Sequence, residues 1–222
     1  MTVRLLLTTL VVMLGAVPVQ AQLAPGYSGY SSAPRQGVDE LYWRFLDQVG
    51  PCLANQKPED SEAFIDTAIS SEAEEQAFDH LFNVGRNRRN NCLGRFSGVY
   101  GAQRAHLRAS VAEGLFEKLS DETIEALIAS PPAAPVAIAS LHDIASCYVA
   151  NHAAEARELL RRTDIATEGE LQFISERVED FGACFPADRE LSLDATTIRM
   201  AVAEAAYRAA TGRPVATIEG RD

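Results

Sequence analysis

The sequence predicts an all-α protein built from two similar helical units that pack as a pseudo-symmetric bundle. Apolar residues recur with the 3.6-residue period of a helix in several segments, and strand-like alternation is scarce. Alanine, a strong helix former, is frequent throughout the second half. Residues 52–116 also resemble residues 147–207, which is typical of a duplicated folding unit. We therefore expect about four helices in each unit, each unit being closed by a disulfide.

The internal match covers both cysteines of each segment in order. Aligning Cys52 with Cys147 brings apolar positions onto apolar positions, and a small later shift brings Cys92 onto Cys184. Further along, residues 107–116 align with residues 198–207 through a shared string, Arg-x-[Ser/Ala]-Val-Ala-Glu-x-x-[Phe/Tyr]. A match of this length favours duplication over coincidence.

Four cysteines allow three pairings, and the internal match selects one of them. If the two copies fold alike, each closes its own bridge, which predicts the disulfides Cys52–Cys92 and Cys147–Cys184. The alternative interpretation is four buried free thiols. An export signal at the start of the chain favours the disulfides.

Residues 1–21 have the features of a secretory signal peptide. Arg4 precedes an apolar run from Leu5 to Leu14, and small residues ending at Ala21 form a cleavage site. The run is too short to span a bilayer, and no similar run follows, so we expect no transmembrane segment in the mature chain. Cleavage after Ala21 predicts a periplasmic or secreted protein, although a eukaryotic secretory route fits as well.

The charge of the mature chain argues against nucleic acid as a partner. The full sequence carries 20 basic and 31 acidic side chains, and its net charge is −11. Cleavage removes one basic residue, Arg4, and leaves a net charge of −12. A strongly acidic surface repels phosphate backbones.

Composition divides the chain into six segments. Residues rich in Gly, Ser and Pro predict flexible regions, and helical periodicity marks the units between them. The predicted segments are the signal peptide (1–21), a disordered leader (22–37), helical unit 1 (38–128), a Pro-rich linker (129–135), helical unit 2 (136–212) and a flexible tail (213–222).

The first unit is expected to begin with a helix over residues 38–49, which Gly50-Pro51 interrupts. A second helix begins near Pro58, because proline suits the first turn. The spacing Ser71-x-x-Glu74 is that of a capping box and predicts the start of a third helix. The clearest period, running from Leu107 to Leu119, predicts the fourth.

The second unit shows the same order of helices. Residues 136–150 lack an interrupting proline and are expected to form one helix, followed by a helix over 153–162. Thr167-x-x-Glu170 repeats the capping-box spacing, and we expect three apolar side chains of the helix it starts to face inward: Leu171, Ile174 and Val178. The last helix is expected to end before Gly212 and Pro214.

Motifs for catalysis, metals or cofactors are scarce in this sequence. It contains no G-x-S-x-G, no C-x-x-C, no H-E-x-x-H and no phosphate-binding glycine loop. His152 and Glu155 share a helix face, but isolated pairs of this kind arise often by chance. We therefore assign no catalytic residue, no metal ligand and no cofactor.

Two matched pairs of charged residues lie on the fourth helices, at Arg108 and Glu113 and at Arg199 and Glu204. Residues five apart on a helix point about 140° apart, so each arginine is not expected to pair with the glutamate of its own helix. One interpretation is a symmetric polar site in each copy. We favour a structural role, in which each charge pairs with a neighbouring helix.

A basic loop breaks the similarity of the two copies. Residues 80–112 contain no Asp or Glu but six arginines, namely Arg86, Arg88, Arg89, Arg95, Arg104 and Arg108. Arginine suits the recognition of phosphate and carboxylate, so Arg86, Arg88, Arg89 and Arg95 form a candidate anion-binding site. The alternative is a solvated loop at a helix C-terminus, where positive charge is favourable.

The pattern resembles small exported proteins of Gram-negative bacteria that carry tandem helical units and have no known activity. The resemblance rests on Ala156 to Leu160, on Ile198 to Tyr207 and on their counterparts in the first copy, within residues 40–210. It implies architecture and location only.

We expect a non-catalytic exported binding or interaction module of the cell envelope, whose partner is an envelope protein or an anionic envelope component engaged through the basic loop. The alternative is a periplasmic hydrolase or envelope-processing enzyme whose site is assembled from separate helices. A third possibility is a structural protein with no small ligand.

Overall fold

The structure is a computed structural model, and it describes residues 40–82, 92, 104–131, 138–185 and 193–219. Every regular element in these ranges is a helix, which confirms the predicted all-α class. The helices are α1 (Glu40–Gln56), α2 (Pro58–Asp66), α3 (Glu72–Phe82), α4 (Arg104–Glu117), α5 (Asp121–Ile128), α6 (Leu141–Asn151), α7 (Ala153–Arg162), α8 (Glu168–Glu176), α9 (Val178–Gly182) and α10 (Ala195–Ala210).

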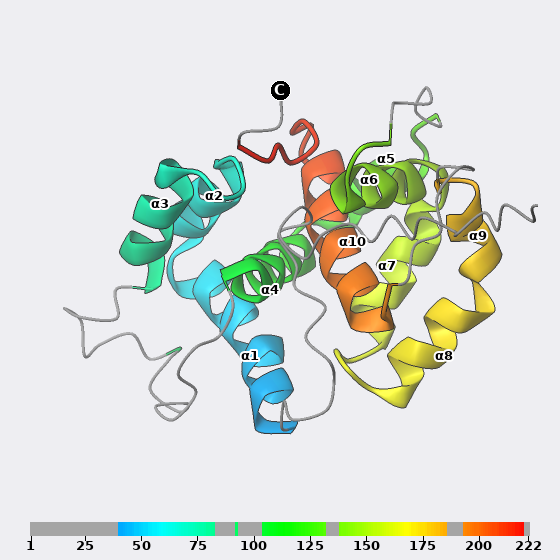
Figure 1. Cartoon of the computed structure of the whole chain (residues 1–222), viewed down its shortest axis with the longest axis horizontal. Helices are drawn as coiled ribbons and strands as arrows, with labels where there is room; N and C mark the ends of the chain where they lie inside the picture. The colour runs from blue at the N-terminus through cyan, green and yellow to red at the C-terminus, as the bar shows by residue number, and fades with distance from the viewer. Residues whose placement is uncertain (1–39, 83–91, 93–103, 132–137, 186–192, 220–222) are drawn as a thin grey trace, which may run out of the picture.

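Helices α4 and α10 form the centre of the molecule. Figure 1 shows α1, α2 and α3 on one side of this pair and α6 to α9 on the other. Helix α4 packs against α1, α2 and α10, and α10 packs against α6, α7 and α8. Both central helices are buried on nearly all sides, whereas the apolar period of the sequence predicted a single buried face.

Helix α1 continues through Gly50-Pro51, where the sequence predicted an interruption. Proline has no N–H and normally breaks the ladder of helix hydrogen bonds. Here a side chain of α4 replaces part of that ladder. The Ser110 hydroxyl donates to the carbonyl of Leu46, and its oxygen accepts from the Gly50 N–H at 3.0 Å. A residue distant in sequence thus contacts the backbone of α1 in the turn that leads into its proline.

The same crossing requires glycine on both helices. A Cβ placed on Gly50 would lie 1.8 Å from the backbone oxygen of Ser110, and one placed on Gly114 would lie 2.4 Å from the Pro51 nitrogen. Only residues without a side chain allow α1 and α4 to approach so closely.

Five of the remaining helices, α3, α5, α6, α8 and α10, begin at residues that cap them. The hydroxyls of Ser71 and Thr167 accept from the backbone N–H of Glu74 and Glu170, as the capping-box spacing predicts. Ser140 caps α6, so this helix begins at Leu141, later than the sequence suggested. Ser120 caps α5, a helix that the sequence analysis did not anticipate.

Both disulfides join the cysteines that the internal match paired. Cys52 is bonded to Cys92 and Cys147 to Cys184, with Cα–Cα distances of 5.5 and 5.7 Å. These separations are ordinary for disulfides. The bonds fit an exported protein, since oxidising compartments preserve them.

Two side chains that were expected to face the core are exposed. Leu171 is 45% exposed and Val178 is 59% exposed, whereas Ile174 is buried as predicted. The buried face of α8 is centred between Glu170 and Ile174, which places Leu171 about 80° from the centre of that face. Helix α8 then ends before Arg177, and the separate short helix α9 begins at Val178 with a new orientation.

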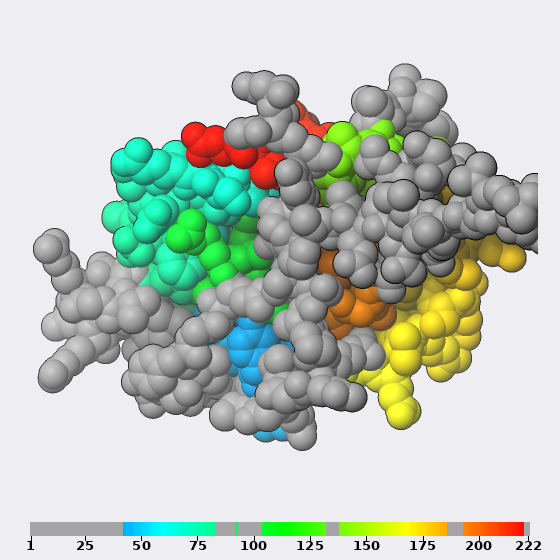
Figure 2. All heavy atoms as spheres, in the orientation of Figure 1, coloured from blue at the N-terminus to red at the C-terminus, as the bar shows by residue number. Residues whose placement is uncertain are grey.

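Residues 213–219, which belong to the segment predicted to be a flexible tail, lie against the turn between α2 and α3. The Ile69 N–H donates to the carbonyl of Thr217 at 2.8 Å, and the Glu219 N–H donates to the carbonyl of Ile69 at 2.9 Å. Arg213 is paired with Asp66 at 2.7 Å. Figure 2 shows this C-terminal segment (red) running beside the first helices (cyan).

Several predicted features lie outside the described residues. They are the signal peptide (1–21), the leader (22–37), the four arginines of the basic loop and most of the linker. Within the part that the structure describes, no helix combines the length and the apolar character that crossing a membrane requires.

Candidate functional site

Arg108 is one of the most deeply buried side chains, with 1% of its surface exposed. Its Nε donates to both carboxylate oxygens of Glu204, at 3.1 and 3.0 Å. Its Nη1 donates to Glu74 at 3.1 Å, so one guanidinium connects α4 with α10 and α3. Buried charges require such partners, because an unpaired ion inside a protein is costly.

The same guanidinium also closes the C-terminus of α2. Nη1 donates to the carbonyl of Phe64 at 3.0 Å, and Nη2 donates to the carbonyls of Ile65 and Thr67 at 2.6 and 2.9 Å. The last carbonyls of a helix lack partners within the helix and carry partial negative charge. Arg108 therefore satisfies backbone groups that would otherwise be buried without hydrogen bonds.

Arg199, the residue aligned with Arg108, makes the corresponding contacts on the other side. It is 1% exposed, and its Nη1 donates to the carbonyl of Leu159 and to the Thr163 hydroxyl, at 3.0 and 2.7 Å. Nη2 donates to the carbonyl of Leu160 near the end of α7. Its carboxylate partner is Glu113, reached through both Nε and Nη2.

The two arginines and two glutamates thus pair reciprocally. Arg108 of α4 binds Glu204 of α10, and Arg199 of α10 binds Glu113 of α4. Neither arginine pairs with the glutamate of its own helix. Each of these charges therefore pairs with the neighbouring central helix, and the structural role that the sequence analysis favoured stays a prediction.

The surroundings of Glu204 are rich in positive charge. Burial by itself would raise the pKa of its carboxyl, but Arg108, His142 and Arg208 outweigh burial and lower this pKa to about 2. Arg208 donates to Glu204 at 2.9 Å and also contacts the carbonyl of Ile65. Glu204 therefore stays ionised at any physiological pH.

The surroundings of Glu113 are acidic instead. Burial raises the pKa of its carboxyl, Arg199 opposes that effect, and the carboxylates of Asp47 and Asp164 raise the pKa further. Glu117 lies on the same side, near a small hollow. Despite this clustering, no three His, Cys, Asp or Glu side chains within the described ranges are placed to hold a metal ion.

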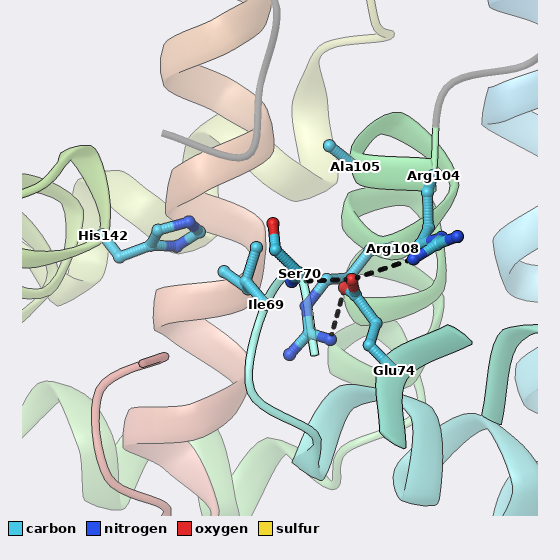
Figure 3. A pocket seen from close by; sticks show the side chains of 7 residues that line it. All are labelled: Ile69, Ser70, Glu74, Arg104, Ala105, Arg108 and His142. Carbon is cyan, nitrogen blue, oxygen red and sulfur yellow. Dashed lines mark hydrogen bonds and ion pairs between the residues drawn. The ribbon is translucent and has the colours of Figure 1, made fainter. Parts of the chain in front are cut away.

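A cavity of about 230 Å³ lies beside the Arg108 network (Figure 3). Its walls come from the turn between α2 and α3, from the first turn of α3, from the first turns of α4 and from α6. The lining residues are Ile69, Ser70, Glu74, Arg104, Ala105, Arg108 and His142. Figure 3 shows His142 and Arg104 on opposite sides of Ile69 and Ser70. The cavity therefore joins the first half of the chain to the second.

Glu74 is fixed in the wall of this cavity by the start of α3. Its backbone N–H donates to Ser71, and its carboxylate accepts from the Ser70 N–H at 2.9 Å. Ser70 has a φ of 66°, and Ala166, which precedes α8 in the same way, has a φ of 59°. A residue with positive φ therefore precedes the N-cap residue of both α3 and α8.

Arg104 is the more accessible arginine of the cavity. Its side chain is 37% exposed, lies 3.7 Å from Glu74 and stacks over the ring of Phe78. At this distance, Arg104 and Glu74 form an ion pair but no hydrogen bond.

The sequence pointed to only part of this site. Arg104 and Arg108 belong to the stretch without acidic residues, whereas Arg86, Arg88, Arg89 and Arg95 lie outside the described residues. Glu74 was recognised only as a capping residue. His142 was missed, and its aligned counterpart, Asp47, has the opposite charge, so the internal match gave no signal for it.

No protein-family model matches the chain, and neither the comparison with curated proteins nor that with solved structures finds a match. The function is therefore argued from the residues and their geometry.

Proposed function

We propose that this chain is an exported, non-catalytic binding protein of the cell envelope whose site is the cavity between its two halves. The observation that carries this proposal is the cavity itself, lined by Ser70 and Arg104 from the first half and by His142 from the second. The export signal in the sequence and the two disulfides support an oxidising location.

We also infer that the halves are two copies of one unit related by a pseudo-two-fold axis. Under such an axis, if residue i of the first copy contacts residue j of the second, then residue j of the first copy contacts residue i of the second. The reciprocal pairs Arg108–Glu204 and Arg199–Glu113 have this property. Their carbonyl contacts at the ends of α2 and α7 add support.

Cell fractionation and photo-crosslinking in the native envelope test the proposed function. A photoreactive residue replaces Ser70, which is exposed beside the cavity, and a control replaces Ser130, which is exposed at the end of α5. We expect a defined envelope component to be captured from position 70 and not from position 130. The proposal would be contradicted if the two positions captured the same components, or if fractionation placed this protein in the cytoplasm.

One observation favours the alternative of a periplasmic hydrolase. The hydroxyl of Ser70 and the imidazole of His142 belong to the same cavity, and serine hydrolases require this pair of groups. However, Ala166 has the same positive φ as Ser70 and carries no hydroxyl. The positive φ of Ser70 therefore needs no catalytic explanation. Labelling of the wild-type protein by a fluorophosphonate probe, lost in Ser70→Ala, would establish the hydrolase instead.

A further inference from the structure

The charges around the cavity do not balance. Two arginines, Arg104 and Arg108, line the cavity together with one carboxylate, that of Glu74. His142 lies beside the same group. The arginines and the carboxylate alone leave one positive charge in excess, and an excess of charge in a partly enclosed site favours a ligand of opposite sign.

We propose that this cavity, lined on one side by His142, binds a small organic anion through its carboxylate or phosphate group, with Arg104 as the contacting side chain. This inference rests on the proposed binding function and names the chemical class of its ligand.

Arg104 is the cation with donors to offer. The guanidinium of Arg108 is committed to Glu204, Glu74 and the carbonyls at the end of α2. Arg104, in contrast, donates no hydrogen bond to any residue in the described ranges, and more than a third of its side chain is exposed. Its fork of N–H groups suits a carboxylate or phosphate.

The carboxylate of Glu74 does not close the cavity to anions. One of its oxygens accepts from Arg108 at 3.1 Å, and the other accepts from the Ser70 N–H at 2.9 Å. Both oxygens are therefore turned to donors in the wall. The nearby excess of arginine offsets the remaining charge of Glu74.

The size and the walls of the cavity limit the ligand. A volume of about 230 Å³ is smaller than typical sites for drug-sized molecules. Ile69 and Ala105 provide apolar surface next to the charged groups. A short-chain carboxylate, or a phosphate group with a small substituent, meets both limits.

Isothermal titration calorimetry of the intact, oxidised protein tests this proposal. The probes are butyrate, its neutral counterpart butyramide, inorganic phosphate and vesicles of phosphatidylglycerol. Wild type is compared with Arg104→Gln, which removes the contacting charge from an exposed position and leaves the buried network in place. The matched control is Arg157→Gln, because Arg157 is similarly exposed, at 34%, and pairs with Glu125 away from the cavity.

We expect butyrate or phosphate to bind the wild type and Arg157→Gln alike, and to bind Arg104→Gln about tenfold more weakly or worse. Vesicle binding that Arg104→Gln abolishes would also support the proposal and would assign the anion to a lipid headgroup. The proposal is wrong if no anionic probe binds the wild type, if Arg104→Gln binds as well as the control, or if butyramide matches butyrate. None of these failures alters export or partner capture, which test the proposed function separately.

Discussion

At the scale of single residues, the two aligned glutamates have opposite surroundings. Glu204 is fully buried between Arg108 and Arg208, while Glu113 has one arginine partner and is approached by Asp47 and Asp164. A carboxylate stabilises the folded state when its attraction to cations exceeds the cost of burial. By this criterion Glu204 contributes more to stability than Glu113.

We predict that Glu204→Gln lowers the free energy of unfolding by about 3 kcal/mol, because it leaves buried arginines without their counter-charge. For a chain of this size, such a loss lowers the melting temperature by about 10 °C. Glu113→Gln is expected to cost only about 1 kcal/mol. The pKa of Glu113 is raised because burial disfavours its ionised form, so removing this charge also removes an unfavourable contribution to folding. Thermal unfolding at pH 7 measures both, and equal losses would contradict the assigned surroundings.

The same two residues predict how stability depends on pH. The pKa of Glu204 in the folded protein, about 2, lies below its ordinary value of 4.5. Its contribution, on the order of 3 kcal/mol, is therefore fully present above about pH 4.5 and is lost as the pH falls toward 2. The pKa of Glu113 is raised, so protonating it in mild acid stabilises the fold.

We therefore expect stability to rise slightly as the pH falls from 7 toward 5 and to decline below about 4.5. Urea unfolding across this range measures the profile. Glu113→Gln should flatten the rise, and Glu204→Gln should reduce the decline. A rise that persists unchanged in Glu113→Gln would assign it to another group, such as the exposed Asp47 or Glu117.

At the scale of elements, α1 shows how a distant residue decides the course of a helix. Ser110 of α4 bonds to both Leu46 and Gly50 and thereby supports the turn that contains Pro51. The aligned positions of the second half have Ala145 and Ser146 in place of Gly50-Pro51, and Ala201 in place of Ser110. Only the half of the chain that has the proline, Pro51, also has the bridging serine, Ser110.

We predict that Ser110→Ala destabilises the protein by about 1–3 kcal/mol, because the Gly50 N–H and the Leu46 carbonyl then remain buried without this partner. Ser130→Ala, at an exposed position, is the control and should change stability by less than about 0.5 kcal/mol. Urea unfolding measures both variants. If Ser110→Ala behaves like the control, α1 does not depend on this contact.

The helices show which features the sequence could predict. Local signals sufficed for α7 and α10, where apolar periodicity and breaking residues agree. They failed for α1, because Ser110, whose hydroxyl bonds to Gly50 next to the proline, lies 60 residues away in the sequence. Helix α5 was missed because its eight residues are shorter than the window over which periodicity is judged, although Ser120 and Thr123 form a recognisable cap. The cavity forms only when residues of α4, of α6 and of the segment from Ile69 to Glu74 come together in the folded chain, and no local pattern in the sequence contains this arrangement.

At the scale of the whole molecule, the charge pairs and the C-terminal segment join the two halves. The central helices exchange Arg–Glu pairs, and residues 213–219 of the second half bond to Ile69 of the first. Each disulfide, in contrast, lies within one half. Contacts between the halves that are this extensive predict one cooperative unfolding unit in place of two independent ones.

Removing one disulfide from the full-length chain tests this cooperativity. Replacing Cys147 and Cys184 by serine opens a loop with a sequence separation of 37, which should cost about 4 kcal/mol of unfolding free energy. Because the halves are expected to unfold together, this loss of stability should also affect helices of the first half, which the Cys147–Cys184 bridge does not contact. Native-state hydrogen exchange is then expected to show faster exchange in α1 and α4 as well as in α6 and α10. Unchanged exchange in α1, with acceleration confined to α6–α10, would mean that the halves are independently stable and that the reciprocal pairs only position them.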